Sequence, residues 1–472
     1  MNKKKTLGQV FTPHYLVCDI LNVAGYITGN DILKKHIIDN SCGDGAFLCE
    51  IVKRYCDAAK SACLSINDIK NDLETYIHGI EIDTNTYEKC LINLSSVAET
   101  YSIYNVNWDI QNKSALDVHE YDNKMDYVVG NPPYVRVHNL DSEFERIKQY
   151  AFCSGGMVDL YLVFYEIGIH MLSENGHLCY ISPSSWFNSL AGRNMRQFIK
   201  QSVYLRDIID LEHFQPFKAS TYTAIVHLHK RYEQFFNYGI YPLQNTIEKV
   251  SSLNIETCIF RDFILLGSHD SIIMLNDIKC KSYKRRVVVV KNGFATLYDN
   301  IFISDNFSFD ELTIPVIKAS TGKWRKAFYP YDSDGKILSY DTIFGYDNIK
   351  DYLNEHKEYL LKGENETDKP LLYGYGRTQA LKDVLVDKYS INNVIKDISS
   401  INFHYVPKGS GVYSGLYILT DVPECTLKKI ILSDEFINYI HMLRKYKSGG
   451  YYTYNSEDLE QFLNYKLSIM MD

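Results

Sequence analysis

Apolar residues in the first half of the chain follow two different spacings. Helical spacing predicts a helix after Thr12-Pro13 with Leu16, Val17 and Ile20 on one face, and further helices from Phe47, from Thr84, over 160–171 and over 192–201. Short apolar or β-branched runs predict strands at 36–39, 76–83, 125–130, 176–182, 205–211 and 221–229. Strands that alternate with helices predict βαβ units, and therefore an α/β fold with a mostly parallel sheet.

The pattern changes at about residues 230–245. Beyond it the chain is irregular, aromatic and rich in turns, and two amphipathic segments, about 426–445 and 456–467, are expected to be helical. We therefore expect two domains, residues 1–235 and residues 236–472, the second of mixed α+β structure. Thr12 is expected to cap the first helix, with Pro13 at its first helical position.

Composition narrows the class of protein. A hydrophobic share of 46% and a charged share of 23% are those of an ordinary globular protein. We expect a cytoplasmic location, because no run of eighteen apolar residues or signal-peptide core follows the basic start of the chain. Eleven cysteines without a zinc-type spacing suggest reduced thiols and no metal site. A net charge of −8 argues against indiscriminate coating of nucleic acid, but a local basic surface remains compatible with it.

A glycine-containing turn joins the first predicted strand to a helix in "IIDNSCGDGAF", residues 37–47. Glycines at 43 and 45 allow backbone amides to approach a ligand closely. Glu81, at the end of the next strand, offers a carboxylate that could accept both ribose hydroxyls of a nucleoside cofactor. The third glycine of a dinucleotide fingerprint is missing, which weakens the reading as a nicotinamide-dependent oxidoreductase.

The stretch "VVGNPPY" ends the strand at 125–130 with a rigid loop. Two prolines fix the backbone and remove two amide donors, so the loop holds Asn131 and Tyr134 in one geometry. The Asn131 side chain and the Pro132 carbonyl could accept the two hydrogens of an exocyclic amine, and Tyr134 offers a face for stacking. We interpret the loop as a site for a planar ring that bears an amine.

Together these motifs resemble the gamma class of S-adenosylmethionine-dependent N6-adenine DNA methyltransferases. The resemblance covers most of residues 8–230, in the motif order of that class: "GQVFTP", "DNSCGDGAF", "GIEID", "NKSALDV", "NPPY", "DLYLVF" and "FQPFKASTYTAIV". It implies a Rossmann-like catalytic domain of the class I methyltransferase type, followed by a target-recognition domain.

The resemblance also implies roles for individual residues. The catalytic loop would comprise Asn131, Pro132, Pro133 and Tyr134. The cofactor S-adenosyl-L-methionine would be held by Thr12, Asp39, Asn40, Ser41, Cys42, Gly43, Gly45, Glu81, Ile82, Ser114 and Phe164. Family members often carry an acid where this chain has Ser114, and Asp117 lies three residues further on, so the partner of the cofactor's adenine amine stays open. Phe217, or Phe214 in a shifted alignment, would pack against the target base.

The expected mechanism is direct methyl transfer to the N6 amine of an adenine flipped out of duplex DNA. Three basic clusters in the second half are candidate DNA contacts: residues 281 and 284–286, residues 318 and 323–326, and residues 377–382. Within the last two, the residues expected to contact DNA are Lys323, Arg325, Arg377 and Gln379.

The resemblance implies double-stranded DNA as partner and, as a cellular role, the modification enzyme of a type II restriction-modification system with a separate cognate restriction endonuclease. Two alternatives stay open. One is a protein glutamine N5-methyltransferase, which uses the same N-P-P-Y chemistry, and the other is a DNA-binding subunit with a non-catalytic methyltransferase scaffold.

Overall fold

The computed structural model describes residues 11–135, 144–154, 159–202, 204–217, 221–280, 286–361 and 373–471. It divides into two compact units, Met1–Ile273 and Met274–Asp472. The expected domain boundary at residue 235 falls inside the first unit, at the start of strand β8. No helix in the described ranges is long and apolar enough to cross a membrane.

Unit 1 is built on a nine-stranded sheet in the order β3-β2-β1-β4-β5-β7-β6-β8-β9. Strands β3, β2, β1, β4 and β5 run parallel, whereas β7 is antiparallel to both of its neighbours. The strands are β1 (Ile37–Asp39), β2 (Ile77–Ile80), β3 (Asp109–Gln111), β4 (Met125–Gly130), β5 (Leu172–Pro183), β6 (Leu205–Asp210), β7 (Thr223–His229), β8 (Phe235–Leu243) and β9 (Thr246–Asn254). The sequence prediction of an α/β fold with a mainly parallel central sheet is confirmed.

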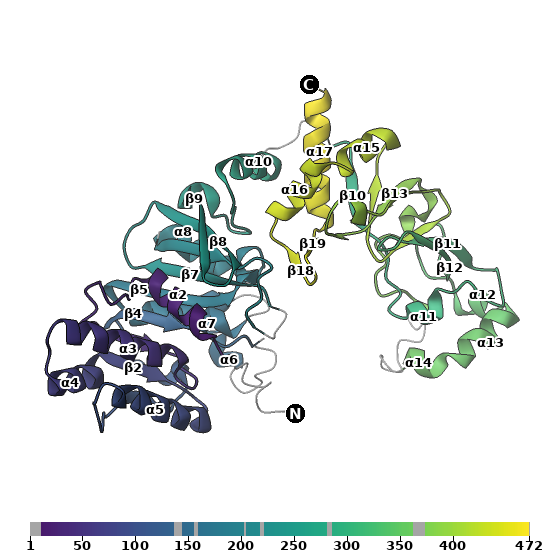
Figure 1. The fold of residues 1–472 in the computed structure, drawn as a ribbon. Coiled ribbons are helices and arrows are strands. Elements are labelled where there is room, and N and C mark those ends of the chain that lie inside the picture. The colour runs from purple at the N-terminus through teal and green to yellow at the C-terminus, as the bar shows by residue number, and fades with distance from the viewer. Residues whose placement is uncertain are drawn as a thin grey trace. The chain divides into compact units, whose positions relative to one another are not determined.

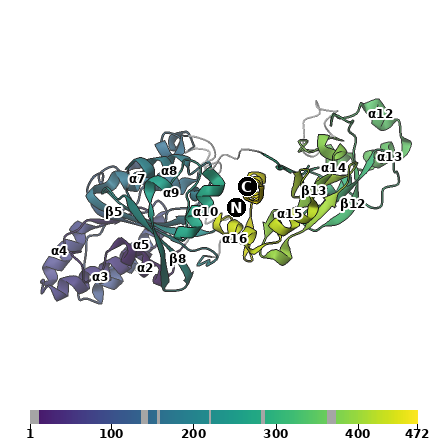
Figure 2. The same cartoon turned by 90° about the horizontal axis from the view of Figure 1, so that it is seen from above.

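Helices cover both faces of this sheet, α2, α3 and α5 on one and α7 and α8 on the other (Figure 2). The helices of unit 1 are α2 (His14–Ala24), α3 (Ala46–Ser61), α4 (Ile66–Tyr76), α5 (Thr84–Glu99), α6 (Phe144–Ile147), α7 (Leu160–Met171), α8 (Arg193–Ser202) and α9 (Ile255–Cys258), with 3-10 turns η1 (Ala115–Asp117), η3 (Ala151–Cys153) and η4 (Ser184–Phe187). Helix α7 packs tightly on the sheet at Gly168, where a Cβ would lie 2.6 Å from Leu178 and 2.7 Å from the Tyr180 hydroxyl. Helix α10 (His269–Cys280) spans the division between the units.

One local prediction is wrong. Thr12 does not cap α2, because Pro13 occupies the N-cap position and offers no side-chain cap. The Thr12 hydroxyl instead accepts a hydrogen bond from the Asn131 side-chain amide, at 3.1 Å. The residue that looked like a local helix signal therefore makes a contact across 119 positions of sequence.

Unit 2 contains three small sheets, β10-β17-β13-β15, β12-β11-β16 and β14-β19-β18. Its strands are β10 (Val289–Asn292), β11 (Thr313–Lys318), β12 (Lys323–Phe328), β13 (Lys388–Ile391), β14 (Val394–Ile395), β15 (Phe403–Val406), β16 (Gly411–Tyr413), β17 (Leu416–Leu419), β18 (Tyr446–Lys447) and β19 (Tyr451–Thr453). Its helices are α11 (Asp299–Phe302), α12 (Tyr340–Phe344), α13 (Asp347–Glu355), α14 (Lys357–Leu361), α15 (Glu424–Ile431), α16 (Asp434–Met442) and α17 (Ser456–Met471), with η6 (Lys382–Leu385) and η7 (Ile398–Ser400).

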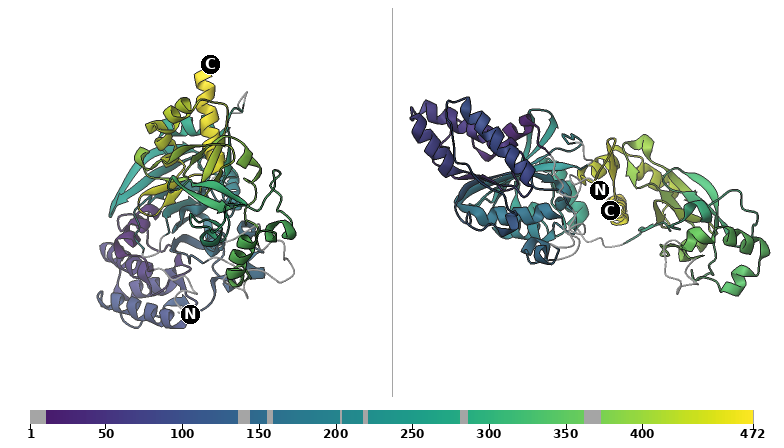
Figure 3. Two further views of the ribbon diagram at one scale, coloured as in Figure 1. Left: turned by 90° about the vertical axis from the view of Figure 1, so that its right-hand side faces the viewer. Right: turned by 90° about the horizontal axis from the view of Figure 1, so that it is seen from below.

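The two amphipathic segments near the end are helical, as predicted. The first is interrupted at Leu432, and Ser433 caps the next helix by accepting from the Phe436 amide. The second forms α17, the yellow helix at the C mark in Figure 3, which packs beside β10 (Figure 1). There the side-chain oxygen of the buried Asn464 accepts hydrogen bonds from the Val287 and Val288 backbone amides, directly before β10.

Candidate active site

The carboxyl ends of three neighbouring strands carry the polar residues that the sequence singled out. Strand β1 lies between β2 and β4 and is parallel to both. Because parallel strands end at the same edge of a sheet, Asp39 at the end of β1, Glu81 after β2 and Asn131 after β4 lie at one edge. The structure thus brings together residues from three separate motifs.

Asp39 is buried against the start of the proline loop. Gly130 has a φ of +151°, and a Cβ there would lie 2.6 Å from the Asp39 Oδ1. The Ser41 amide donates to the same oxygen at 3.0 Å. Burial of the carboxyl group raises the pKa of Asp39 from 3.8 to about 7, against the opposing effect of the Ser41 hydrogen bond. Position 130 therefore requires glycine for both its backbone angle and its space.

The loop after β1 leaves one buried donor without a partner. Asn40 accepts from the Tyr180 hydroxyl at 2.9 Å through Oδ1. Its Nδ2 is buried and has no hydrogen-bond partner among the described residues. The loop continues through Gly43 and Gly45, with φ of 56° and 90°. A buried amide nitrogen without a partner costs free energy, and a ligand acceptor at this loop would offset that cost.

Glu81 is tied to the same loop. Its Oε2 accepts from the Gly43 amide at 3.0 Å, and its Oε1 accepts from the Asp83 amide at 2.8 Å. Burial raises the pKa of this carboxyl group as well. The next residue, Ile82, is an apolar side chain that is 57% exposed, which gives a flat ring an apolar surface beside the carboxylate.

Asn131 is held from two sides. Its Nδ2 donates to Thr12 Oγ1, and its backbone carbonyl accepts from the Ser41 hydroxyl at 3.5 Å. Pro132 is buried and Pro133 half-buried beside it. The loop therefore joins the segment before α2, the loop after β1 and the end of β4.

Tyr134 and Phe217 lie next to each other. Their ring centroids are 6.2 Å apart and their planes are inclined at 82°. The Tyr134 hydroxyl donates to the Ile181 carbonyl at 3.4 Å, which fixes the ring. Phe214 instead packs against Tyr241, with centroids 5.3 Å apart. Of the two alignments left open by the sequence, the structure brings Phe217 rather than Phe214 to the proline loop.

Both candidate partners of the cofactor's adenine amine already have protein partners. The Ser114 hydroxyl caps η1 by accepting from the Leu116 amide at 3.3 Å, and Asp117 forms an ion pair with Arg146. Phe164 is buried on α7. Sequence reasoning missed Asn112, whose Nδ2 donates to the Glu81 carbonyl at 2.8 Å and whose Oδ1 accepts from the Thr84 hydroxyl at 2.9 Å. Its position directly after a strand was the available signal.

The basic clusters of unit 2 differ in how far they are already neutralised. Arg325 pairs with Asp305 at 3.1 Å and Lys326 with Asp310, whereas Lys323 and Trp324 on the same strand are exposed. Arg286 pairs with Glu460 at 2.6 Å. Arg377 and Gln379 are exposed, and no ion pair of Arg377 occurs within the described ranges. Residues 8–10, 218–220 and 281–285, which sequence reasoning also used, lie outside the described residues.

Comparison with known proteins gives a consistent result. Residues 46–217 match the sequence family described as Eco57I restriction-modification methylase. The chain is 25% identical over 468 residues to the Type II methyltransferase M.BstVI of Geobacillus stearothermophilus, covering 85% of this chain and 82% of that protein. It is 24% identical to the Type II restriction enzyme and methyltransferase RM.Eco57I of Escherichia coli, covering 88% of this chain and 52% of that protein.

Solved structures share the fold. The type IIL restriction-modification enzyme MmeI, solved with DNA, superposes with a TM-score of 0.64 at 14% identity over 94% of this chain and 63% of that chain. The DrdV–DNA complex gives a TM-score of 0.55 at 10% identity over 99% of this chain and 57% of that chain. The chain therefore spans about half to two thirds of the length of these larger enzymes and most of the length of M.BstVI. With Type II methyltransferases as its relatives, the chain carries an Eco57I restriction-modification methylase domain.

Proposed function

We propose that this protein transfers a methyl group from S-adenosyl-L-methionine to the N6 amine of adenine in duplex DNA. The observation that carries the proposal is the placement of Asn131 at one sheet edge with Asp39 and Glu81. Two carboxylates with backbone amides suit a charged nucleoside, and the asparagine loop suits an amine-bearing ring.

The residues at this edge fit the cofactor. Asn40 Nδ2 supplies a buried donor for its carboxylate, Glu81 supplies acceptor oxygens for its ribose, and Ile82 supplies an apolar surface for its adenine. Asp39, once ionised, would supply a negative charge for its positively charged methionine part; burial raises the pKa of this carboxyl group to about 7. When bound, the cofactor supplies a methyl group activated by a sulfonium.

The catalytic contribution of the chain is positioning and charge stabilisation. Thr12 and Ser41 fix the Asn131 side chain and backbone, so the Asn131 side-chain oxygen and the Pro132 carbonyl can accept the two N–H bonds of the target amine. These acceptors stabilise the positive charge that develops on the nitrogen during transfer. No residue needs to form a covalent intermediate: the amine nitrogen would bond to the methyl carbon as the carbon–sulfur bond breaks, S-adenosyl-L-homocysteine would leave as a neutral thioether, and the surplus proton on nitrogen would pass to solvent.

The target base must leave the duplex to reach this loop. Tyr134 and Phe217 offer two rings at right angles, one to stack on the base and one to close its edge. Stacking of this kind contributes about 1–3 kcal/mol per base, which offsets part of the cost of unstacking.

We assign DNA recognition to unit 2, with Lys323, Arg377 and Gln379 as candidate contacts. Beside Arg377, the side chain of Leu297 is 70% exposed, and its φ of 68° is a strained angle for leucine. It packs over Gly376, where a Cβ would lie 2.3 Å from the Leu297 Cγ. An apolar side chain held outward beside an arginine that has no ion pair among the described residues suits insertion between base pairs. The partner of this chain in the cell would be a separate restriction endonuclease that cleaves the same sequence.

The test is incubation of the chain with tritiated S-adenosyl-L-methionine and plasmid DNA that lacks adenine methylation, followed by nucleoside analysis. We expect label in N6-methyladenine. Asn131→Ala should lower the transfer rate at least 100-fold and leave cofactor affinity within about threefold, because the lost side-chain acceptor acts at the target amine. Label in a protein, or none in DNA with every tested sequence, would refute the substrate assignment.

A further inference from the structure

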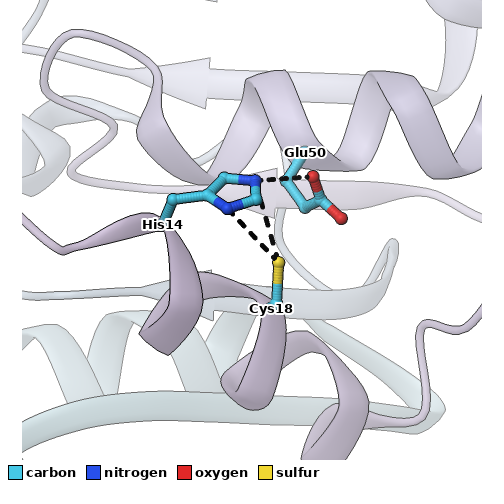
Figure 4. Close-up of side chains that lie close together, drawn as sticks. All are labelled: His14, Cys18 and Glu50. Carbon is cyan, nitrogen blue, oxygen red and sulfur yellow. Dashed lines mark hydrogen bonds and ion pairs between the residues drawn. The ribbon is translucent and has the colours of Figure 1, made fainter. Parts of the chain in front are cut away.

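Three side chains with metal-binding atoms converge where α2 meets α3. His14 and Cys18 lie one helical turn apart on α2, and Glu50 lies on α3, 36 positions from His14 (Figure 4). Their ligand atoms all lie within 4.8 Å of one another. Sequence spacing alone did not indicate a metal site, because the third residue comes from a different helix.

The two separations from His14 are close to those of a tetrahedral zinc site. The His14 Nε2 lies 3.1 Å from the Glu50 Oε2 and 3.8 Å from the Cys18 Sγ. With Zn–N and Zn–O bonds of about 2.0 Å and a Zn–S bond of about 2.3 Å, tetrahedral angles require about 3.3 Å between N and O and about 3.5 Å between N and S. The two His14 separations are within a few tenths of an ångström of these values, and all three ligand atoms lie within 4.8 Å of one another, so a small ion can reach them once the side chains adjust.

The surroundings hold one ligand in place and leave another adjustable. Arg54 donates to the Glu50 Oε1 at 3.0 Å, which orients the carboxylate and leaves Oε2 directed at His14. Arg54 also donates to the Cys18 carbonyl at 3.2 Å, so it links both elements. The His14 side chain is 66% exposed and can adjust to the ion. Lys53, whose Nζ lies 4.0 Å from the Glu50 Oε2, is exposed and can turn away.

We propose that His14, Cys18 and Glu50 bind one Zn²⁺ ion that clamps α2 to α3. An imidazole, a thiolate and a carboxylate form a donor set for zinc rather than for magnesium or calcium. On binding, the Cys18 thiol releases its proton to the solvent, and the ion with a thiolate and a carboxylate is electrically neutral. The site is distinct from the cofactor edge but adjoins it in sequence, because α2 starts two residues after Thr12 and α3 starts directly after Gly45.

Cobalt is the probe for the test, because Co²⁺ takes the place of Zn²⁺ and reports a bound thiolate by a charge-transfer absorption band. The full chain without a histidine tag is stripped with a chelator, dialysed and titrated with Co²⁺. We expect one equivalent with a thiolate band that Zn²⁺ bleaches. Cys18→Ser should abolish the band. Cys63→Ser, at an exposed cysteine just beyond the end of α3, should leave it unchanged.

A second measurement keeps the proposal open to refutation if Cys18→Ser fails to fold. His14→Ala removes an exposed side chain and should weaken Zn²⁺ binding at least 10-fold, since loss of even a ligand's supporting partner costs 10–100-fold. Zn²⁺ should raise the melting temperature of the wild-type chain and of Cys63→Ser, but not of Cys18→Ser. Absence of a thiolate band in the wild type, its persistence in Cys18→Ser, or equal Zn²⁺ affinity in His14→Ala would overturn the proposal. The result is independent of methyl transfer.

Discussion

Cofactor affinity should depend on pH through Asp39. This residue is 1% exposed, and burial raises the pKa of its carboxyl group to about 7. A cofactor with a positively charged methionine part favours the ionised carboxylate, so its binding lowers the pKa of Asp39 and releases a proton. Below pH 7 that proton must be removed before the charge pair can form, at a cost of about 1.4 kcal/mol per pH unit.

The size of the effect follows from the ionised fraction. With a pKa of about 7, the fraction of ionised Asp39 falls about tenfold between pH 8 and pH 6. The dissociation constant for S-adenosyl-L-methionine should therefore rise about tenfold over this range. Equilibrium dialysis with the tritiated cofactor measures it, and circular dichroism at both values checks that the chain stays folded.

Asp39→Asn provides the control, because it removes the titrating group with little change in shape. This variant should bind the cofactor more weakly than the wild type at pH 8 and show a dissociation constant that is flat between pH 6 and pH 8. Glu81 is also buried with a raised pKa, so a slope that survives in Asp39→Asn would assign the titration to Glu81 instead. A wild-type constant that changes less than twofold would refute the reasoning altogether.

Three further predictions concern the same unit. Gly130→Ala places a Cβ 2.6 Å from Asp39 Oδ1 at a φ of +151°. It should therefore lower the free energy of unfolding by about 1–3 kcal/mol, measured by urea titration, and weaken cofactor binding, measured by dialysis. Phe217→Ala should lower the methyl-transfer rate more than Phe214→Ala while both keep the cofactor affinity; equal rates would remove Phe217 from the base site. Burial lowers the pKa of His177 from 6.5 to about 3, so the contribution of the neutral ring to stability is present above pH 6.5 and is lost as the pH falls toward 3. Urea titrations at pH 7 and pH 5 should show the free energy of unfolding falling by at most about 1.4 kcal/mol per pH unit, and His177→Gln should reduce this dependence.

The placement of the candidate site residues could be predicted from the sequence better than the contacts that hold them. Asp39, Glu81 and Asn131 could be placed at one edge because each follows a short apolar run, and parallel strands end together. The hydrogen bond from Asn131 to Thr12 and that from Tyr180 to Asn40 could not be predicted. Their partners lie 119 and 140 positions apart, and hydrophobic spacing carries no information on which distant side chains meet.

The extent of unit 1 was predicted less well, for a reason visible in β9. Among the described strands this edge strand pairs only with β8, and it leaves most of its side chains exposed, so its sequence shows no alternation of apolar and polar positions. Strand β8 contains Gly239 and Pro242, two residue types that are uncommon inside strands, so its sequence does not predict a strand clearly. An edge strand that is held by backbone hydrogen bonds rather than by buried side chains is difficult to recognise from sequence, and the boundary was therefore placed at 235 instead of beyond β9.

Charge in unit 2 shows the converse problem, because a basic cluster in sequence is not a basic surface in space. Arg325 and Lys326 read as DNA contacts, yet each meets an acid from the preceding segment, Asp305 or Asp310. Such exposed pairs stabilise the fold by about 1 kcal/mol at most, and phosphate can still compete for the cations, so pairing lowers the expected contribution without abolishing it. Lys323 and Arg377, which keep their charge unpaired within the described residues, should therefore carry more of the salt dependence of DNA binding than their paired neighbours.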